Sequence, residues 1–400
     1  MLENLSFGRS ITHQTTLLKK RVALVRGPNL NTWEMQNFSP LADTFDFVGF
    51  TSRGHNFDLR EIPFDVRRLW SWGQFIRPRL FRKAFYGLLG DYHDLQGLAA
   101  ALHGFDIVHT AESFYYCSYQ AARAKRTHGY KLVVTVWENI PFLFNYPSTQ
   151  RLKEAVFSEA DLLLAISERA KEVLILEGAP PERIRVQMPG IDTRHFRPLQ
   201  KDESLLRKFG CSTDDIVVLF VAHLYVQKGI YDLLFAFKRL LQQSRVKNIK
   251  LLIAGRGPEA AKVESLIGQL GLRSATRLIG AHAYSRMSSI HSLADIFVLP
   301  SQPAHEWQEQ FGYVLVESMA SGKPVVSTRS GSIPEVVGDA GLLVPPCDFV
   351  SLGEAIRTLV ENASLREELG SKARARATTL FDAAKVAQQF KTHYEALLNV

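Results

Sequence analysis

Residues 305–337 read HEWQEQFGYVLVESMASGKPVVSTRSGSIPEVV, and this stretch decides how the second half of the chain folds. A helix is expected to begin near Phe311 and Gly312, after a loop, and a short apolar strand is expected over residues 324–327. A helix that leads into a short apolar strand is typical of parallel sheets wound with helices. The stretch therefore predicts an α/β fold for the part of the chain around it.

The same alternation of short apolar runs and helical patterns extends over the whole chain of 400 residues, a length that suits two α/β domains. Turn-forming residues cluster without periodicity over residues 188–200 and predict the join between the domains. Ligands of such sheets bind at the carboxyl ends of the strands, so the cleft between the domains is the expected site. The expected strands lie at residues 22–25, 45–50, 106–109, 132–136, 162–166 and 184–187 in the first half, and at 216–221, 251–254, 277–279, 296–299, 324–327 and 342–344 in the second.

Composition argues against several classes of protein. No run approaches the roughly 18–20 apolar residues of a membrane-spanning helix, and residues 1–25 lack the apolar core of a signal peptide, so a cytoplasmic location is expected. The chain has neither a CxxC nor an Asp-x-Asp pair, so neither a zinc site nor a metal-clamped diphosphate is indicated. The net charge of +8 favours anionic ligands without choosing among them.

Two glutamates in the opening stretch, Glu309 and Glu317, are eight residues apart. Eight helical residues rise about 12 Å, which is comparable with the length from a sugar to a ribose across a diphosphate. Glu309 at the loop is then placed to bind sugar hydroxyls, and Glu317, deeper along the helix, to bind a ribose diol. Alternatively, Glu309 complements the helix dipole and Glu317 is solvated. The apolar residues around Glu317 favour the binding role.

The start of the same helix is a candidate anion site. The first N–H groups of a helix have no partner within it and bind phosphate readily. A glycine there lets the backbone approach a ligand closely. The candidate donors to a diphosphate are Phe311, Gly312, Tyr313 and Val314.

This stretch resembles the Glu-x7-Glu motif of the retaining glycosyltransferases of family 4, the large glycogen-synthase-like group. The resemblance implies that Glu309 binds the transferred sugar and that Glu317 binds the ribose. Residues 219–237, LFVAHLYVQKGIYDLLFAF, resemble the family's strand–loop–helix in which a lysine, here Lys228, neutralises the donor phosphates. Residues 251–259, LLIAGRGPE, resemble the loop beside the nucleotide base, which makes Gly257 a donor-binding candidate.

The resemblance also implies the GT-B architecture, in which two Rossmann-like domains face each other across a cleft. Residues 1–195 are expected to form the acceptor-side domain and residues 196–378 the nucleotide-sugar domain. Residues 380–398, LFDAAKVAQQFKTHYEALL, resemble the helix that crosses back to the first domain. Residues 379–400 are therefore expected to pack on the first domain.

Two positions depart from the family pattern on the donor side. His223 stands where many members have an arginine, so the bidentate fork of a guanidinium is lost there. Arg256 or Arg26 is expected to compensate. The loop RGPNLNTWE, residues 26–34, has Gly27 alone where the family often has several glycines, so a close approach to the sugar phosphate is less assured there.

The first domain offers further candidates at strand ends. Trp137 and Glu138 stand where many members carry a His and an Asp; Trp137 would stack on a sugar ring and Glu138 would place a carboxylate at the reaction centre. A buried aromatic residue and a capping acid are an equal alternative. His109 ends another strand and is a catalytic candidate, although a structural role is the commoner one for such a histidine.

Residues 67–90 are rich in arginine and aromatic residues and contain no acid. From Pro78 onward the apolar residues follow one stripe, which predicts a basic amphipathic helix. Such a helix either contacts an anionic membrane surface or packs its stripe on the sheet with its arginines in water. Membrane contact would make a lipid-linked acceptor and a peripheral place on the inner membrane face the expectation. No nucleic-acid-binding motif accompanies the basic residues.

The leading interpretation is a transferase that moves a sugar from a nucleotide-sugar to a hydroxyl of an acceptor, such as a lipid-linked glycan or a polysaccharide intermediate. Retention of configuration is implied by the family alone. Neither a cofactor nor a metal is expected, because Lys228 would offset the phosphate charge. Two alternatives stay open: a non-catalytic nucleotide-sugar-binding subunit, and a nucleotide-sugar epimerase on the same fold.

Overall fold

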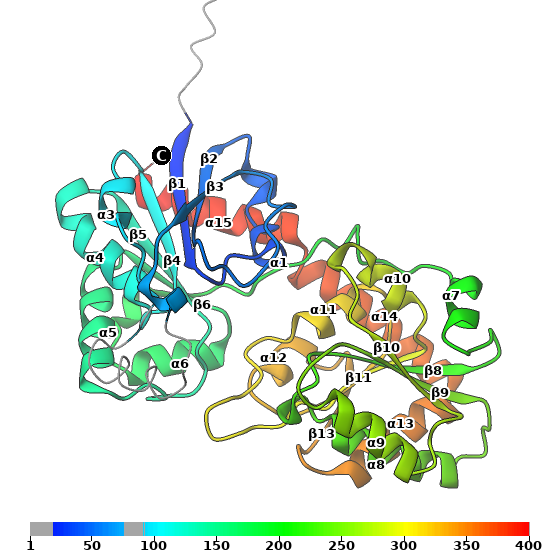
Figure 1. Cartoon of the computed structure of the whole chain (residues 1–400). Coiled ribbons are helices and arrows are strands. Elements are labelled where there is room, and N and C mark those ends of the chain that lie inside the picture. Colours follow the sequence, from blue (N-terminus) through cyan, green and yellow to red (C-terminus); the bar gives the residue numbers. More distant parts are fainter. Residues whose placement is uncertain (1–18, 76–90, 92, 400) are drawn as a thin grey trace, which may run out of the picture.

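The computed structural model describes residues 19–75, 91 and 93–399, and these form two parallel sheets with helices packed around them (Figure 1). The first sheet has seven strands in the order β3-β2-β1-β4-β5-β6-β7. The second has six in the order β10-β9-β8-β11-β12-β13. In both sheets the strand order reverses next to the first strand, which is the doubly wound arrangement. The expected GT-B fold is confirmed.

The central strands are apolar runs because parallel strands covered by helices are buried on both faces. In β1 every residue from Val22 onward is buried, and in β8 every residue after Ile216 is buried. The strands of the first sheet are β1 (Lys20–Gly27), β2 (Phe45–Ser52), β3 (Asp65–Leu69), β4 (Ile107–Ala111), β5 (Lys131–Val136), β6 (Leu162–Ala165) and β7 (Ile184–Val186). Those of the second are β8 (Ile216–Val221), β9 (Ile249–Ala254), β10 (Thr276–Gly280), β11 (Ile296–Leu299), β12 (Val325–Thr328) and β13 (Gly341–Val344).

Helices connect the strands and cover the sheets. The described helices of the first half are α1 (Thr32–Met35), α3 (Leu98–Ala101), α4 (Tyr116–His128), α5 (Pro147–Glu159) and α6 (Glu168–Leu176). Those of the second half are α7 (Glu203–Lys208), α8 (Ile230–Gln243), α9 (Ala260–Gln269), α10 (Met287–Ser292), α11 (Tyr313–Ala320), α12 (Ile333–Val337) and α13 (Phe349–Glu361). The chain ends in α14 (Ala363–Leu380) and α15 (Ala383–Leu398).

The edge strand β3 was not expected from the sequence. It pairs with β2 at the edge of the first sheet and exposes Arg67 and Arg68, so it lacks the apolar run that marks the central strands. The strand is followed by a short 3-10 helix over Trp72–Phe75. The amphipathic helix predicted from Pro78 falls within residues 76–90 and lies outside the described residues.

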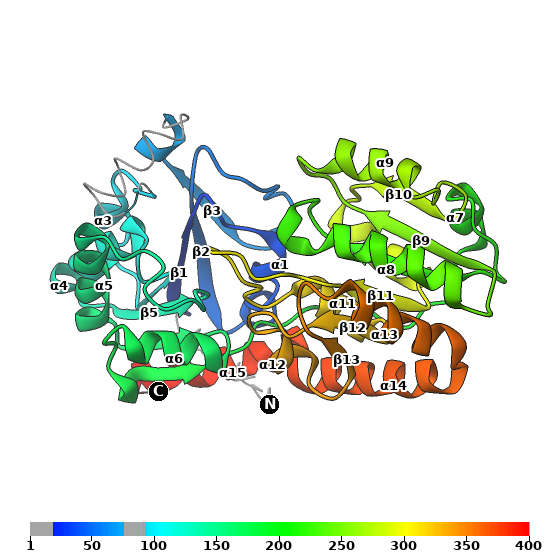
Figure 2. The same ribbon diagram turned by 90° about the horizontal axis from the view of Figure 1, so that it is seen from below.

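The last two helices join the halves of the molecule. Figure 2 shows α14 along the second domain and α15 continuing beneath the first. Where the two helices meet, the chain forms two backbone hydrogen bonds with Ile191 of the hinge: Ile191 N–H donates to the Phe381 oxygen (2.8 Å), and Ala383 N–H donates to the Ile191 oxygen (2.8 Å). Asp382 then caps α15 with its side chain. Tyr394 of α15 is fully buried against Phe45 of the first sheet, with 5.5 Å between the ring centroids.

Candidate active site between the two domains

The helix that carries Glu317 begins next to the position expected from the sequence. Gly312 is the residue before α11 and has a φ of +84°, and the helix runs from Tyr313 to Ala320. Glu309 therefore lies in the loop, and the 12 Å helical rise inferred from the sequence does not apply, because only the part from Tyr313 to Glu317 is helical. Phe311, at the end of the loop, is buried.

Glu309 is the centre of a polar cluster. Its Oε2 accepts hydrogen bonds from Lys228 Nζ and from Ser301 Oγ, each at 2.7 Å. Its backbone oxygen accepts from the Ser332 N–H at 2.9 Å and from Asn139 Nδ2 at 2.9 Å. The last of these bonds comes from the first domain. Glu309 is thus held on both sides of the cleft, which confines the position of its carboxylate.

Lys228 reaches Glu309 from the loop after β8. Its ammonium also lies 4.5 Å from the ring centroid of Trp307, a cation–π distance. The next residue, Gly229, has a φ of +73°, and a Cβ there would lie 1.8 Å from the Pro300 carbonyl oxygen. Only glycine fits this turn, so the backbone requires Gly229 directly after Lys228.

Glu317 is buried within the second domain. One carboxylate oxygen lies 3.3 Å from Nε2 of His291, which is itself fully buried on α10. The Nδ1 of that ring has no partner in the described residues. Sequence reasoning did not single out His291, and its place on a helix far from Glu317 in the chain left no local signal.

The loops after β8 and β9 lie against each other. A Cβ on Gly257 would come within 2.4 Å of the Leu224 carbonyl oxygen, so glycine is needed for this contact. Arg256 and His223 are both exposed at this end of the second sheet. The Leu224 N–H donates to the Arg256 carbonyl at 2.9 Å. His223 and Arg256 therefore lie on two loops that are hydrogen-bonded to each other.

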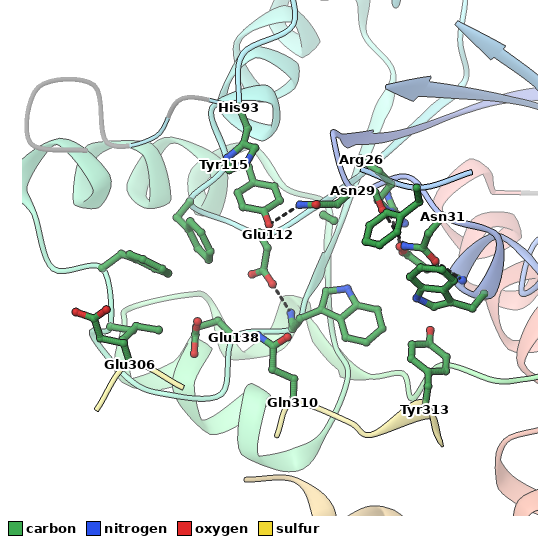
Figure 3. A pocket seen from close by; sticks show the side chains of 18 residues that line it. Arg26, Asn29, Asn31, His93, Glu112, Tyr115, Glu138, Glu306, Gln310 and Tyr313 are labelled. Carbon is green, nitrogen blue, oxygen red and sulfur yellow. Dashed lines mark hydrogen bonds and ion pairs between the residues drawn. The ribbon is translucent and has the colours of Figure 1, made fainter. Parts of the chain in front are cut away.

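A cavity of 490 Å³ opens between the domains beside this cluster (Figure 3). We call it the interdomain cavity. It adjoins the α11 loop, because Gln310, next to Glu309, and Tyr313 line it. Gly27 does not line it, whereas the preceding Arg26 does. The lining residues are Arg26, Asn29, Asn31, Trp33, Glu34, Phe57, His93, Ala111, Glu112, Phe114, Tyr115, Trp137, Glu138, Leu143, Phe144, Glu306, Gln310 and Tyr313.

Trp137 and Glu138 both line this cavity at the end of β5. The Glu138 carboxylate accepts from the N–H groups of Asn139 (2.9 Å) and Ile140 (2.8 Å), so it caps the following loop. Burial raises the pKa of Glu138 despite these hydrogen bonds. Glu138 therefore caps the loop, as one of the two interpretations expected, and it also lines the interdomain cavity.

Glu112, at the end of β4, is a cavity residue outside the sequence-predicted set. It is 5% exposed and its Oε1 accepts from the Trp137 N–H at 3.1 Å. Burial, and next the neighbouring Glu138, raise the pKa of Glu112 well above its ordinary value. Its position directly after a buried strand is the signal that would have found it.

Arg26 is buried in the lining and forms an ion pair with Glu34, with 2.7 Å between Nε and Oε1. Its Nη1 donates to the backbone oxygens of Val25 (3.1 Å) and His109 (2.8 Å). The guanidinium is therefore held by contacts within the first domain.

His109 does not line the cavity. The ring is fully buried, with Nδ1 2.7 Å from Tyr394 Oη and Nε2 2.7 Å from Thr135 Oγ1. Burial, and next the charge of Arg26, lower the pKa of His109 well below its ordinary value. A neutral imidazole with both nitrogens bonded favours the structural role over the catalytic one.

The two domains are also bonded directly around the cavity. Glu335 of α12 accepts from the first N–H groups of α6, those of Glu168 (2.7 Å) and Arg169 (3.0 Å). Ser167 Oγ lies 2.9 Å from Ser332 Oγ. Two carboxylate oxygens at a helix N-terminus are a favourable cap across the domain boundary. The loop that holds Glu309 is therefore part of the interface.

Two family models match the chain in succession. The model described as Glycosyltransferase Family 4 matches residues 49–195, and the one described as Glycosyl transferases group 1 matches residues 201–376. The chain belongs to the family 4 glycosyltransferases. The glutamate pair and Lys228 of this family 4 chain lie within the second match.

Known relatives agree with this placement. A D-inositol 3-phosphate glycosyltransferase of Corynebacterium kroppenstedtii is 29% identical over 62% of this chain, and the match spans only 56% of that protein's length. An N-acetyl-alpha-D-glucosaminyl L-malate synthase of Bacillus anthracis is 26% identical over 73% of this chain and 74% of that protein. The solved Anabaena Alr3699/HepE in complex with UDP has a TM-score of 0.77 at 21% identity, and the match covers 95% of this chain and 100% of that one. The last comparison shows a shared fold.

The described residues include neither a membrane-spanning helix nor a cluster of metal ligands. None of the helices there is long and apolar enough to cross a membrane. Within the same residues no group of three or more His, Cys, Asp and Glu side chains is arranged to hold a metal ion.

Proposed function

We propose that this family 4 chain transfers a sugar from a nucleoside-diphosphate sugar to a hydroxyl group of an acceptor, with retention at the anomeric carbon. The observation that carries the proposal is the Lys228–Glu309 pair at 2.7 Å beside the start of α11. It brings a cation, a carboxylate and the free N–H groups of a helix to one place. These are the groups that a sugar diphosphate requires.

In the proposed reaction the bond from the anomeric carbon to the diphosphate oxygen breaks, and the bond to the acceptor oxygen forms on the same face. The proton of the acceptor hydroxyl passes to the leaving diphosphate. Lys228 and the start of α11 stabilise the negative charge that builds on the leaving group, Glu309 binds hydroxyls of the transferred sugar, and Glu317 binds the ribose. Because Lys228 and α11 supply positive charge, we propose that no metal is needed.

The donor is tested with purified protein and a panel of UDP-, GDP- and ADP-sugars, with and without EDTA, by following release of nucleoside diphosphate. UDP-sugars come first, because the similar Anabaena protein was solved with UDP. One donor should be hydrolysed slowly and in the presence of EDTA. Binding without any turnover would instead favour a non-catalytic binding subunit.

Glu309→Gln is the matched test of the site, because it keeps the side-chain shape and removes the charge. A hydrogen bond to a charged group contributes about 1.5–3 kcal/mol, so release should fall about 10- to 150-fold. Glu264→Gln, an exposed residue of α9, is the control and should not change the rate. A Glu309→Gln variant as fast as the parent would contradict the proposal.

For the acceptor we propose a lipid-linked glycan reached at a membrane surface. The support is the described start of the segment 67–90, where Arg67 and Arg68 are exposed on β3 and the neighbouring Trp70 and Trp72 are 48% and 66% exposed. Exposed tryptophan beside arginine suits an anionic lipid interface. The protein should sediment with phosphatidylglycerol vesicles, and more weakly after Trp72→Ala. Equal binding to phosphatidylcholine vesicles would contradict the charge argument.

A further inference from the structure

The interdomain cavity contains polar atoms that need a partner. Arg26 Nη2, Glu112 Oε2 and Tyr313 Oη are buried, line this cavity, and have no hydrogen-bond partner among the described residues. They come from β1, from the residue after β4 and from α11, and so from both domains. Leaving a buried polar atom unpaired costs about 1–3 kcal/mol. Three such atoms around one cavity indicate a polar ligand rather than three independent packing faults.

Glu112 is held in an uncommon conformation at this place. Its φ is +62°, in the left-handed region that residues with a side chain seldom occupy. The Glu112 N–H donates to the Thr135 carbonyl at 2.8 Å, and its Oε1 accepts from the Trp137 N–H, so the neighbouring strand β5 fixes both ends of the residue. Figure 3 shows its carboxyl group directed toward the space between the labelled side chains. Backbone strain of this kind is concentrated at ligand sites.

The walls of the cavity are aromatic. Trp137 and Tyr313 face each other from the two domains, with 5.9 Å between ring centroids. Trp33 packs edge-on against Phe57 at 4.7 Å. Aromatic walls with a few convergent polar groups suit a ligand that has apolar faces and polar edges. A sugar ring has this character, because its C–H groups form the faces and its hydroxyls form the rim.

The charges of the lining disfavour an anion. Arg26 is already paired with Glu34, and the ring of His93 lies 2.5 Å from an Asp91 carboxylate oxygen. Glu112, Glu138 and Glu306 add three carboxyl groups to the wall. The charge of Arg26 is already offset by Glu34, so its unpaired Nη2 suits a neutral hydroxyl. A phosphate or carboxylate on the acceptor would add a negative charge that no further lysine or arginine of the described lining balances, and such a mismatch disfavours anionic ligands. The raised pKa of Glu112 leaves its carboxyl group able to donate a proton in a hydrogen bond to a hydroxyl oxygen.

We propose that the interdomain cavity receives the reacting end of the acceptor as an uncharged sugar ring, with Trp137 against its face and Glu112 hydrogen-bonded to one of its hydroxyls. This inference rests on the proposed transferase function and adds the class of acceptor. It concerns only the ring that enters the cavity. An anionic lipid carrier farther along the same acceptor remains compatible with it.

The test uses the donor that the panel identifies and compares pairs of acceptors that differ in charge. Methyl glucoside, methyl mannoside and methyl galactoside are set against glucose 6-phosphate, mannose 6-phosphate and glucuronate. At least one neutral ring should raise nucleoside diphosphate release about tenfold over hydrolysis, and its charged counterpart should not. Faster transfer to the charged rings, or no response to any neutral ring, would overturn the inference. Failure of all donors is a different result, which contradicts the transferase function itself.

Glu112 is tested separately by Glu112→Ala and Glu112→Gln. The alanine variant should raise the KM of the neutral acceptor about tenfold or more and the KM of the donor much less. Glutamine can donate and accept in the same place, so it should restore most of the affinity. Glu172→Gln, an exposed residue of α6, is the matched control.

A pH profile separates binding from a merely structural role. If neutral Glu112 donates to the acceptor, the acceptor KM of the wild type should rise as pH increases through the raised pKa of Glu112, because the proton is then lost. The Glu112→Gln variant should lack this rise. Identical profiles in the two proteins would remove Glu112 from acceptor binding.

Discussion

Replacing Lys228 by methionine tests the role of positive charge at the donor site. Methionine keeps the unbranched, apolar part of the side chain and removes the ammonium group, which lies 2.7 Å from Glu309 Oε2 and 4.5 Å from the Trp307 ring centroid. A single preorganised group aimed at developing charge contributes about 2.7–4 kcal/mol to the transition state. We therefore expect kcat to fall about 10²- to 10³-fold, and to fall by a larger factor than KM rises.

The same change affects stability by a smaller amount. Removing one partner of a buried ion pair costs about 3–5 kcal/mol. Here the Lys228 side chain is 20% exposed and Ser301 still donates to Glu309, so about 1–2 kcal/mol is expected. For a domain of this size that corresponds to a decrease of about 2–8 °C in Tm.

The assay is steady-state release of nucleoside diphosphate, with Tm followed by calorimetry on the same samples. Lys262→Met, a 71% exposed residue of α9, is the control and should leave both quantities unchanged. A Lys228→Met protein that is folded and retains kcat within about threefold of the wild type would refute the assignment of the leaving-group charge to Lys228.

Two further predictions follow from contacts around the site. In Gly331→Ala the new Cβ would lie 2.1 Å from the Glu309 carbonyl oxygen, at a φ of +56°, so the loop that holds Glu309 must shift. We expect kcat to fall about 10²-fold while the circular dichroism spectrum stays native. An unchanged kcat would show that the position of Glu309 is not critical. In Tyr394→Phe the buried His109 Nδ1 loses the hydroxyl that lies 2.7 Å away. The free energy of unfolding, measured in urea, should decrease by about 1–3 kcal/mol, with little effect on the donor KM. Equal stability of the two proteins would contradict a structural role for His109.

The sequence determined the fold class because its signals are local. Of the thirteen strands in the described residues, all but β3 overlap the strands expected from the sequence, and the central strands do so because a strand covered by helices on both faces is apolar. Lys228 and the glutamate pair were singled out because the segments around them resemble family motifs, and the structure places Lys228 2.7 Å from Glu309. Gly229, the glycine of the first of these segments, is required where it stands, because a side chain there would collide with the Pro300 carbonyl oxygen.

The tertiary structure decided the rest, because it depends on residues distant in the chain. Edge strand β3 has no apolar run, since one side of its ladder and its Arg67 and Arg68 side chains face solvent. His109 is buried with its Nδ1 bonded because Tyr394, 285 residues later, reaches its ring. Glu112 becomes a cavity residue only where β4 and β5 bring it beside Glu138 and the second domain closes over both. The hydrophobic periodicity of the sequence does not reveal such long-range contacts, because each strand follows its own local pattern whichever strand it packs beside.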